Sequence, residues 1–335
     1  MRHYVIAGIL VIVTAVLTYL GLIAAHLMPV EASVQSISID WLWNWEIIAI
    51  SFLFALIVVP ILYSLVVFRR KKGDTTDADH IEGNTTLEIT WTIIPLITVV
   101  VFAYMGAYSL GDIRRVDPQA MIINVTAIQW NWSFDYPDYG FASTELHLPV
   151  NKQVVLEMKS KDVIHSFWVP EFRIKQDVVP GRTTEYRITP DLIGHYKVRC
   201  AELCGTSHAY MEGPVIVDSQ ADFTAWVTEQ QAIAAKAGQT PQGRGELLVK
   251  NSGCFSCHTI DGSKLIGPTW LGLFGSKVKL SDGSVVTADE IYIKNSILDP
   301  SSQIVAGFEN AAHMPQFPFT DQQIADIIAY LQTLK

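Results

Sequence analysis

The chain has 335 residues, 50% of them hydrophobic, and a formal net charge of −9. Its length predicts two or three domains, and its apolar content is too high for a purely soluble protein. The acidic balance without a basic stripe argues against nucleic acid as a partner, because binding to phosphates needs clustered Lys and Arg. We therefore expect a multidomain membrane protein that does not bind nucleic acid.

An apolar run from Tyr4 to Met28 opens the chain. It is long enough to span a bilayer, which takes roughly 20 residues. A cleaved signal peptide is the alternative, since Val30-Glu31-Ala32 fits a small-residue cleavage site, but the run exceeds the usual h-region of about 7 to 15 residues. Residues 1–30 are therefore predicted to be a retained transmembrane helix, with a signal peptide as the alternative.

Two further apolar runs, 47–68 and 92–110, predict a transmembrane hairpin within residues 40–112. Trp residues precede the first run, and the basic cluster 69–72 follows it. Trp gathers at membrane interfaces, whereas Lys and Arg mark the cytoplasmic side. The pattern predicts a multi-pass protein of a bacterial cell membrane, with everything after about residue 111 on the extracytoplasmic side.

Glu88 precedes the last of these runs, in a segment that carries Pro95 near the expected start of the helix, where a missing N–H costs least. An ionisable group at the entrance of a span is a functional candidate by default. A Glu in the first turn of a helix also complements the helix dipole. Charge alone leaves both roles of Glu88 open.

From residue 121 to residue 217 the chain has short alternating runs rich in Val, Ile, Thr and aromatic residues, separated by turn dipeptides such as Pro-Asp, Asn-Lys and Pro-Gly. Such runs predict an all-β sandwich or Greek-key barrel, which we place at residues 113–220. The aromatic residues of Gln129-Trp130-Asn131-Trp132 fit the core of such a domain.

The segment 200–211 carries two thiols, an imidazole and a thioether. Soft ligands of this kind select copper or iron–sulfur chemistry over hard cations. A mononuclear blue-copper site uses one Cys, so the second thiolate suggests two coppers bridged by sulfur, with His165 as the best placed second imidazole. A disulfide is the alternative, but it would not explain the other ligands. We call this segment the copper loop; its candidate ligands are Cys200, Cys204, His208 and Met211.

Residues 221–243 are rich in Ala and Gln and predict a helical tail followed by a short polar linker. The remaining residues, 244–335, contain Cys254-Phe-Ser-Cys257-His258. This is the attachment motif of haem c, in which two thiols add to the vinyl groups and the His becomes an axial ligand. A redox Cys pair would not require the His, and a zinc knuckle would require two further paired ligands, which are absent from the sequence.

The sixth haem ligand follows by elimination. Met314 is the only Met after Cys257, and it shortly precedes an amphipathic helix expected over residues 321–334. His/Met ligation raises the potential of a haem, which suits a donor to copper. His313 is the alternative ligand.

His165 and the copper loop resemble, spacing for spacing, the dinuclear CuA site of cytochrome c oxidase subunit II, and residues 121–217 resemble the cupredoxin domain of that family. The resemblance adds Glu202 as a ligand. In the family the backbone carbonyl of this residue binds copper, and its side chain binds Mg²⁺ at the border with the catalytic subunit, which fits the preference of a hard ion for oxygen. The resemblance thus implies CuA and a possible shared Mg²⁺.

Further roles come only with the resemblance. Trp130 matches the residue through which electrons enter the copper pair, although Asn131 replaces the usual Tyr. Glu88 matches a Glu at the entrance of a proton channel into the catalytic subunit. The C-terminal residues resemble an all-α class I cytochrome c, in which the Pro268 carbonyl would orient His258.

The whole order resembles subunit II of the haem-copper oxygen reductases that carry a fused cytochrome c. This implies an electron-transfer subunit of a terminal oxidase, in which haem c passes electrons to CuA and on to a catalytic subunit that reduces O₂ to water and pumps protons. That subunit and further membrane subunits are the implied partners, with a cytochrome, a cupredoxin or a quinol-oxidising complex as donor. The spans lack the histidines of an oxygen-reducing centre, because His3, His26 and His80 lie at ends or in a loop.

Three other functions are compatible with the residues. One is the electron-entry subunit of a nitric oxide reductase. Another is a membrane-anchored copper-binding protein, which would have one exchangeable copper and no use for a haem. The third is an interaction scaffold in which the Cys pairs are structural. The number of coppers and covalent haems per chain separates the last two from an oxidase subunit, and oxygen uptake against nitric oxide consumption by the complex separates the first.

Overall fold

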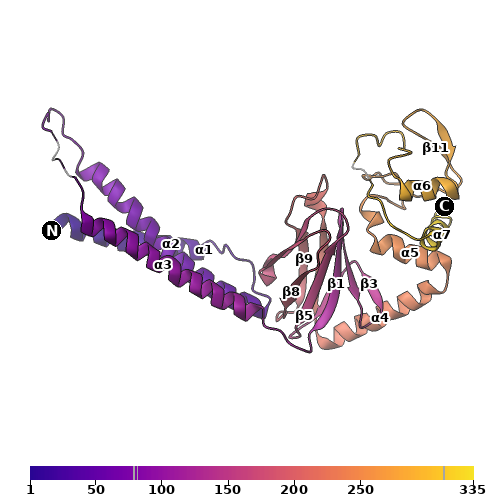
Figure 1. The fold of residues 1–335 in the computed structure, drawn as a ribbon, viewed down its shortest axis with the longest axis horizontal. Helices are drawn as coiled ribbons and strands as arrows, with labels where there is room; N and C mark the ends of the chain where they lie inside the picture. The colour runs from indigo at the N-terminus through magenta and orange to yellow at the C-terminus, as the bar shows by residue number, and fades with distance from the viewer. Residues whose placement is uncertain (78–79, 81, 312–313) are drawn as a thin grey trace. The chain divides into compact units, whose positions relative to one another are not determined.

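The chain forms two compact units, which are drawn in Figure 1. One comprises residues 1–31 and 35–115, and the other comprises residues 32–34 and 116–335. The computed structural model describes residues 1–77, 80, 82–311 and 314–335.

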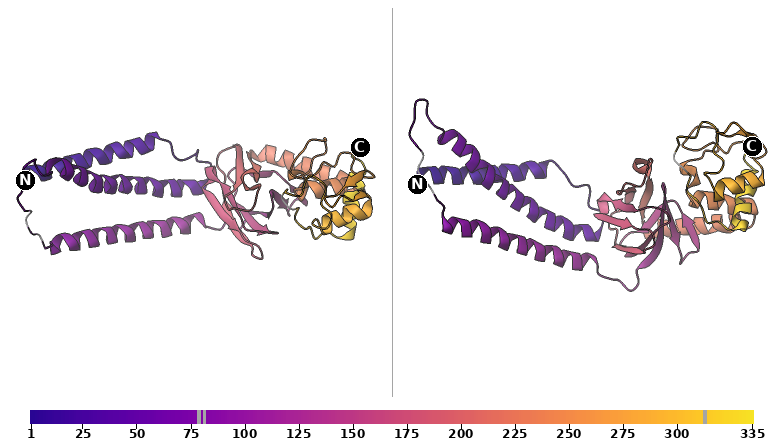
Figure 2. Two further views of the ribbon diagram at one scale, coloured as in Figure 1. Left: turned by 90° about the horizontal axis from the view of Figure 1, so that it is seen from above. Right: turned by 45° about the horizontal axis from the view of Figure 1, so that its top comes forward.

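Within its described residues, the first unit contains three helices that are long and apolar enough to cross a membrane (Figure 2). They are α1 (Arg2–Ala24), α2 (Val34–Val67) and α3 (Thr85–Ile113). The prediction of N-terminal transmembrane helices is confirmed. The expected place of Pro95 was wrong, because it lies inside α3. The side chain of Asn84 accepts a hydrogen bond from the backbone N–H of Leu87 and so starts the helix well before the proline.

The second unit begins with two five-stranded β-sheets. One sheet has the order β3-β2-β1-β5-β8 and the other the order β4-β10-β9-β6-β7. In the first, β1 runs antiparallel to β2 and parallel to β5. The strands are β1 (Met121–Ile128), β2 (Asn131–Tyr136), β3 (Phe141–Ser143), β4 (Leu146–Pro149), β5 (Val154–Ser160), β6 (His165–Val169), β7 (Ile174–Val178), β8 (Thr184–Ile188), β9 (Gly194–Cys200) and β10 (Glu212–Asp218). This arrangement confirms the predicted all-β domain.

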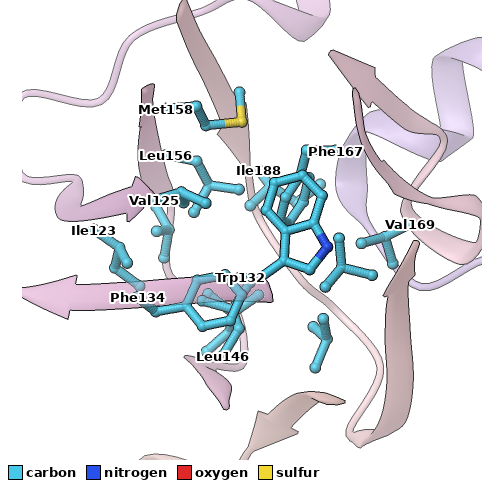
Figure 3. Close-up of a cluster of buried hydrophobic side chains, with 14 of the residues drawn as sticks. Ile123, Val125, Trp132, Phe134, Leu146, Leu156, Met158, Phe167, Val169 and Ile188 are labelled. Atoms are coloured by element: carbon cyan, nitrogen blue, oxygen red, sulfur yellow. The ribbon is translucent and has the colours of Figure 1, made fainter. Parts of the chain in front are cut away.

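The core of this domain lies between the sheets. Trp132, Phe134 and Tyr136 alternate along β2 with partly exposed residues and are themselves buried. Successive side chains of a strand point to opposite faces, so this pattern turns one face of β2 inward. Figure 3 shows Trp132 beside Phe167 of β6. The packed core therefore fixes the strands from which the copper ligands emerge.

Helices follow the sheets. They are α4 (Gln220–Gly238), α5 (Pro241–Asn251), α6 (Glu290–Leu298) and α7 (Asp321–Leu331), with short 3₁₀ turns at η1 (Pro170–Phe172), η2 (His208–Tyr210) and η3 (Cys254–Ser256). The segment 221–243, predicted to be a helical tail and a linker, is almost entirely helical, and only Gln239 and Thr240 separate α4 from α5. The helical C-terminal domain is confirmed, and it also contains a two-stranded sheet of β11 (Lys277–Lys279) and β12 (Val285–Thr287).

The C-terminal domain is held together where α5 crosses α7. A Cβ added at Gly245 would lie 1.9 Å from the carbonyl oxygen of Asp326, so only glycine allows the two backbones to approach this closely. Beside this crossing, Nε and Nη2 of Arg244 donate to the buried carboxylate of Asp326 at 2.8 and 2.7 Å. The crossing fixes α5, which leads directly into the haem attachment motif.

Candidate copper and haem sites

The predicted copper ligands come from three places in the fold. His165 begins β6, Cys200 ends β9, and the rest of the copper loop runs through η2 toward β10. The ligating atoms of His165, Cys200 and Cys204 lie within 4.8 Å of one another, and all three side chains are buried. The two sulfur atoms are 3.6 Å apart, and the thiols are free. The structure thus has no disulfide at this place.

The other predicted ligands surround the two thiols. Nδ1 of His208 lies 3.5 Å from Cys204 Sγ, and Sδ of Met211 lies 3.8 Å from the same sulfur. The thiol of Cys200 donates to the carbonyl oxygen of Glu202 at 3.2 Å. The side chain of Glu202 is exposed. The fold therefore brings six predicted residues together with two sulfurs at the centre, a donor set that fits copper.

The sequence analysis missed Asp162, which orients one ligand. Its Oδ1 accepts a hydrogen bond of 2.8 Å from Nε2 of His165, and Nδ1 of the ring faces Cys200 Sγ at 3.9 Å. Its Oδ2 also accepts from the backbone N–H of Gln129 at 2.7 Å. A carboxylate on the far nitrogen of a ligating imidazole fixes the ring and its tautomer. An acid three residues before His165 was the signal that could have revealed this role.

The two thiols are electrostatically coupled. Burial raises the pKa of Cys200, but its hydrogen bonds to His165 and the backbone outweigh burial and bring that pKa below the usual value of a cysteine. Burial and the neighbouring charge of Cys200 raise the pKa of Cys204. Two sulfurs this close do not readily both ionise without a cation. The site therefore favours a metal that would neutralise both thiolates.

Trp130 packs on the copper loop. A Cβ added at Gly205 would lie 3.0 Å from Cζ2 of Trp130 and 2.9 Å from Nε2 of Gln129. The same Gln129 amide donates to the carbonyl oxygen of Cys204 at 2.6 Å. The missing side chain at Gly205 therefore allows a direct contact between Trp130, which is 6% exposed, and the loop that carries the thiols.

The C-terminal domain encloses a cavity of about 780 Å³, called the haem cavity below. Cys254, Cys257, His258 and Met314 all line it, together with many apolar residues. Its volume is in the range of about 300 to 1,000 Å³ that ligand sites have. Both thiols are free. Size, apolar lining and placement of the motif therefore fit a covalently attached haem.

The imidazole of His258 is held in one orientation. Its Nδ1 donates to the carbonyl oxygen of Pro268 at 2.8 Å, and its ring stacks on Trp270 with the centroids 4.8 Å apart. A Cβ at Gly267 would lie 2.7 Å from His258 Cε1, so glycine lets this turn approach the ring. Burial lowers the pKa of His258, which keeps Nε2 available to a metal. His313, the alternative sixth ligand, lies outside the described residues.

Glu88 lies apart from both sites, in the first turn of α3. Its side-chain Oε1 accepts a hydrogen bond from the backbone N–H of Asn84 at 3.3 Å. It is exposed in the chain taken alone. The structure thus shows a contribution to the start of the helix, and a role in proton entry remains a prediction.

Three family models match successive parts of the chain. They describe the transmembrane domain of cytochrome c oxidase subunit II (residues 21–110), the periplasmic domain of that subunit (141–220) and cytochrome c (243–335). Cytochrome c oxidase subunit 2 of Alkalihalophilus pseudofirmus is 34% identical over 299 residues, a match that covers 83% of this chain and 85% of that protein. The corresponding protein of Bacillus subtilis is 32% identical over 300 residues, covering 83% of each. A solved structure of the periplasmic domain of subunit II from Bradyrhizobium japonicum is 33% identical and covers 35% of this chain and 98% of its own, with a TM-score of 0.33.

Proposed function

Because the chain belongs to the cytochrome c oxidase subunit II family and carries a cytochrome c domain at its C-terminal end, we propose that the copper loop holds a CuA pair and the haem cavity a haem c. The chain is an electron-transfer subunit of a terminal oxidase, and it acts as an oxidoreductase only as part of that complex. The relatives do not favour a nitric oxide reductase subunit or a copper carrier.

One observation carries the copper assignment: ligands from β6, β9 and the copper loop converge on two free thiols. His165, Cys200, Glu202 through its carbonyl, Cys204, His208 and Met211 would hold the metals. When bound, copper and haem supply one-electron redox chemistry. The protein contributes rigidity, because β6 and β9 are paired strands and Asp162 holds the His165 ring. Fixed ligands limit the rearrangement that accompanies a change in charge.

The same reasoning applies to the haem cavity. Cys254 and Cys257 would form the thioether bonds, His258 would be one axial ligand and Met314 the other. The carbonyl of Pro268 and the ring of Trp270 orient the imidazole. Most of the cavity lining is apolar, and burial and axial ligation are both means by which a protein tunes a haem potential.

Metal and haem content tests the proposal. The purified chain should contain two coppers and one covalent haem, and its copper EPR spectrum should show a delocalised mixed-valence pair. One copper per chain, or an EPR spectrum of an isolated copper, would contradict the dinuclear assignment. A Glu202→Gln variant of the assembled oxidase is the matched control, because only the exposed side chain changes. Its copper content should stay at two per chain, while the proposed Mg²⁺ at the border with the catalytic subunit should be lost.

We also propose that Glu88 delivers protons to the catalytic subunit. Its exposure at a span entrance supports this role. A Glu88→Gln oxidase should take up protons more slowly during turnover, with unchanged copper and haem, because the amide oxygen can still accept from Asn84 but carries no proton at this position. Unchanged proton uptake would leave Glu88 only its contribution to the helix.

The soluble domains are proposed to lie on the extracytoplasmic side of a bacterial cell membrane. The support is the basic cluster 69–72, which directly follows α2, since Lys and Arg mark the cytoplasmic side. The chain then crosses back through α3 before the sheets begin. The catalytic subunit and an electron donor are the proposed partners.

A further inference from the structure

The glycine that precedes the haem attachment motif lies in close contact with the sheet domain. Gly253, which directly precedes the first Cys of the motif, has a φ of +73°, and a Cβ added there would lie 2.4 Å from Cβ of Asn131 and 2.8 Å from its Cγ. Asn131 is the neighbour of Trp130, the residue that packs on the copper loop. The haem motif and the Trp130 segment are therefore joined through a contact that has no room for another methyl group.

Three further observations place the same two surfaces together within this compact unit. Ile128, at the end of β1, is buried in the hydrophobic cluster of the haem domain that contains Val249. Conversely, Cys257 packs against the core of the sheets. A second cavity, of about 600 Å³, is lined by Thr206 and Ser207 of the copper loop and by residues 264–266 and 306–311 of the haem domain.

The connection between the domains supports a fixed position. Trp226 of α4 stacks on His147 of the sheet, with the ring centroids 4.0 Å apart. At the corner between α4 and α5, a Cβ added at Gly243 would lie 2.4 Å from the carbonyl oxygen of Ala237, so the two helices are in close contact. A helix fixed at one end and a tight corner at the other do not behave as a flexible tether.

We propose that Asn131 is a positioning residue, whose small side chain lets the haem attachment motif dock directly on the Trp130 segment. The assignment of the two sites to copper and haem rests on the proposed function, whereas the docking itself rests only on the contacts. In the family that the sequence resembles, the corresponding segment usually has a Tyr at the position of Asn131. Cβ and Cγ of Asn131 are the atoms nearest to the position of an added Cβ at Gly253. The ring of a Tyr would extend from Cγ and would therefore crowd Gly253.

The side chain of Asn131 is partly buried, but no hydrogen bond of its amide nitrogen accounts for this position. Its Nδ2 makes no hydrogen bond to any described residue. A buried donor without a partner costs free energy. The role proposed for this side chain therefore depends on its close contact with Gly253 and not on a hydrogen bond.

The test uses the assembled oxidase with Asn131→Tyr. Electron transfer from the haem domain to the copper domain should slow by about tenfold, the change in docked population that corresponds to a loss of about 1.4 kcal/mol of docking free energy. The absorption spectra and potentials of both centres should be unchanged. Gly253→Ala should have the same effect, and combining it with Asn131→Gly should restore part of the rate by reopening the space.

Gly275→Ala is the matched control. Gly275 also has a positive φ, of +81°, in the same domain, but an added Cβ there meets nothing within 4 Å, and it is not one of the described residues that line the haem cavity. It therefore reproduces the backbone strain without the collision, and the transfer rate should stay at that of the wild type. An equal slowing in Gly275→Ala, or an unchanged rate in Asn131→Tyr, would overturn the proposal.

Hydrogen exchange gives a readout that needs no electron transfer. Residues 128–132 and 249–257 should exchange slowly in the wild type, and both should exchange faster in Asn131→Tyr, because undocking exposes both surfaces. Unchanged exchange in both segments would contradict docking. If the two-copper and haem content fails while the coupled exchange persists, the proposed function falls and the docking stands.

Discussion

Replacing Cys204 with serine is expected to remove the copper pair and to reduce oxidase activity by more than about 100-fold. Changing a residue that only supports a ligand costs about 10 to 100-fold in metal affinity or activity, and loss of the ligand itself should cost more. Cys204 lies between Cys200, His208 and Met211, with three predicted ligand atoms within 3.8 Å of its sulfur. A hydroxyl is a harder ligand than a thiolate and binds copper less well. Copper analysis, EPR and oxygen uptake measure the result.

Cys257→Ser is the reciprocal control. It replaces a thiol that lines the haem cavity by a hydroxyl of nearly the same size. It should abolish one of the two covalent haem bonds and leave two coppers in place. A melting temperature for each variant separates loss of metal from loss of fold, since buried Cys204 belongs to the core of the sheets. Two bound coppers in Cys204→Ser would show that this thiolate is not a ligand.

Met314→Ala is expected to keep the covalent haem and to lower its reduction potential by about 100 mV or more, well within the range of about 0.8 V over which axial ligands set haem potentials. The thioether lines the same cavity as His258, and its removal takes away the ligand that raises the potential. The haem absorption spectrum and a redox titration measure the change.

Two further variants test whether Met314 or His313 is the axial ligand. His313→Ala changes the neighbouring alternative ligand and should leave the spectrum and potential unchanged. Met314→His fills the cavity with another ligand and should restore a six-coordinate spectrum with a low potential, which a merely structural role of Met314 would not produce. An unchanged spectrum in Met314→Ala together with a changed one in His313→Ala would reverse the choice of ligand.

The structure added contacts between side chains that no sequence motif marks. Asp162 was not recognised, because a carboxylate three residues from a histidine becomes its partner only when the turn before β6 brings them together. The helical tail expected within 221–243 is α4, but the polar linker expected after it is reduced to the two-residue corner of Gln239 and Thr240, because α5 already begins at Pro241. The docking of Gly253 on Asn131 was equally invisible.

The sequence by itself determined the features whose chemistry is local. Three apolar runs of sufficient length predicted the membrane helices, period-two patterns predicted the sheets, and the Cys-x-x-Cys-His motif predicted the haem, because each depends on neighbouring residues alone. The copper loop was readable for the same reason, and the need for a second imidazole pointed to His165 as its remote ligand, which the resemblance to subunit II then matched. How His165 is held depended on the turn that brings Asp162 to its ring. Only the tertiary structure decided where Trp130 packs and how the haem domain meets it, because these contacts join residues far apart in the chain and depend on close packing.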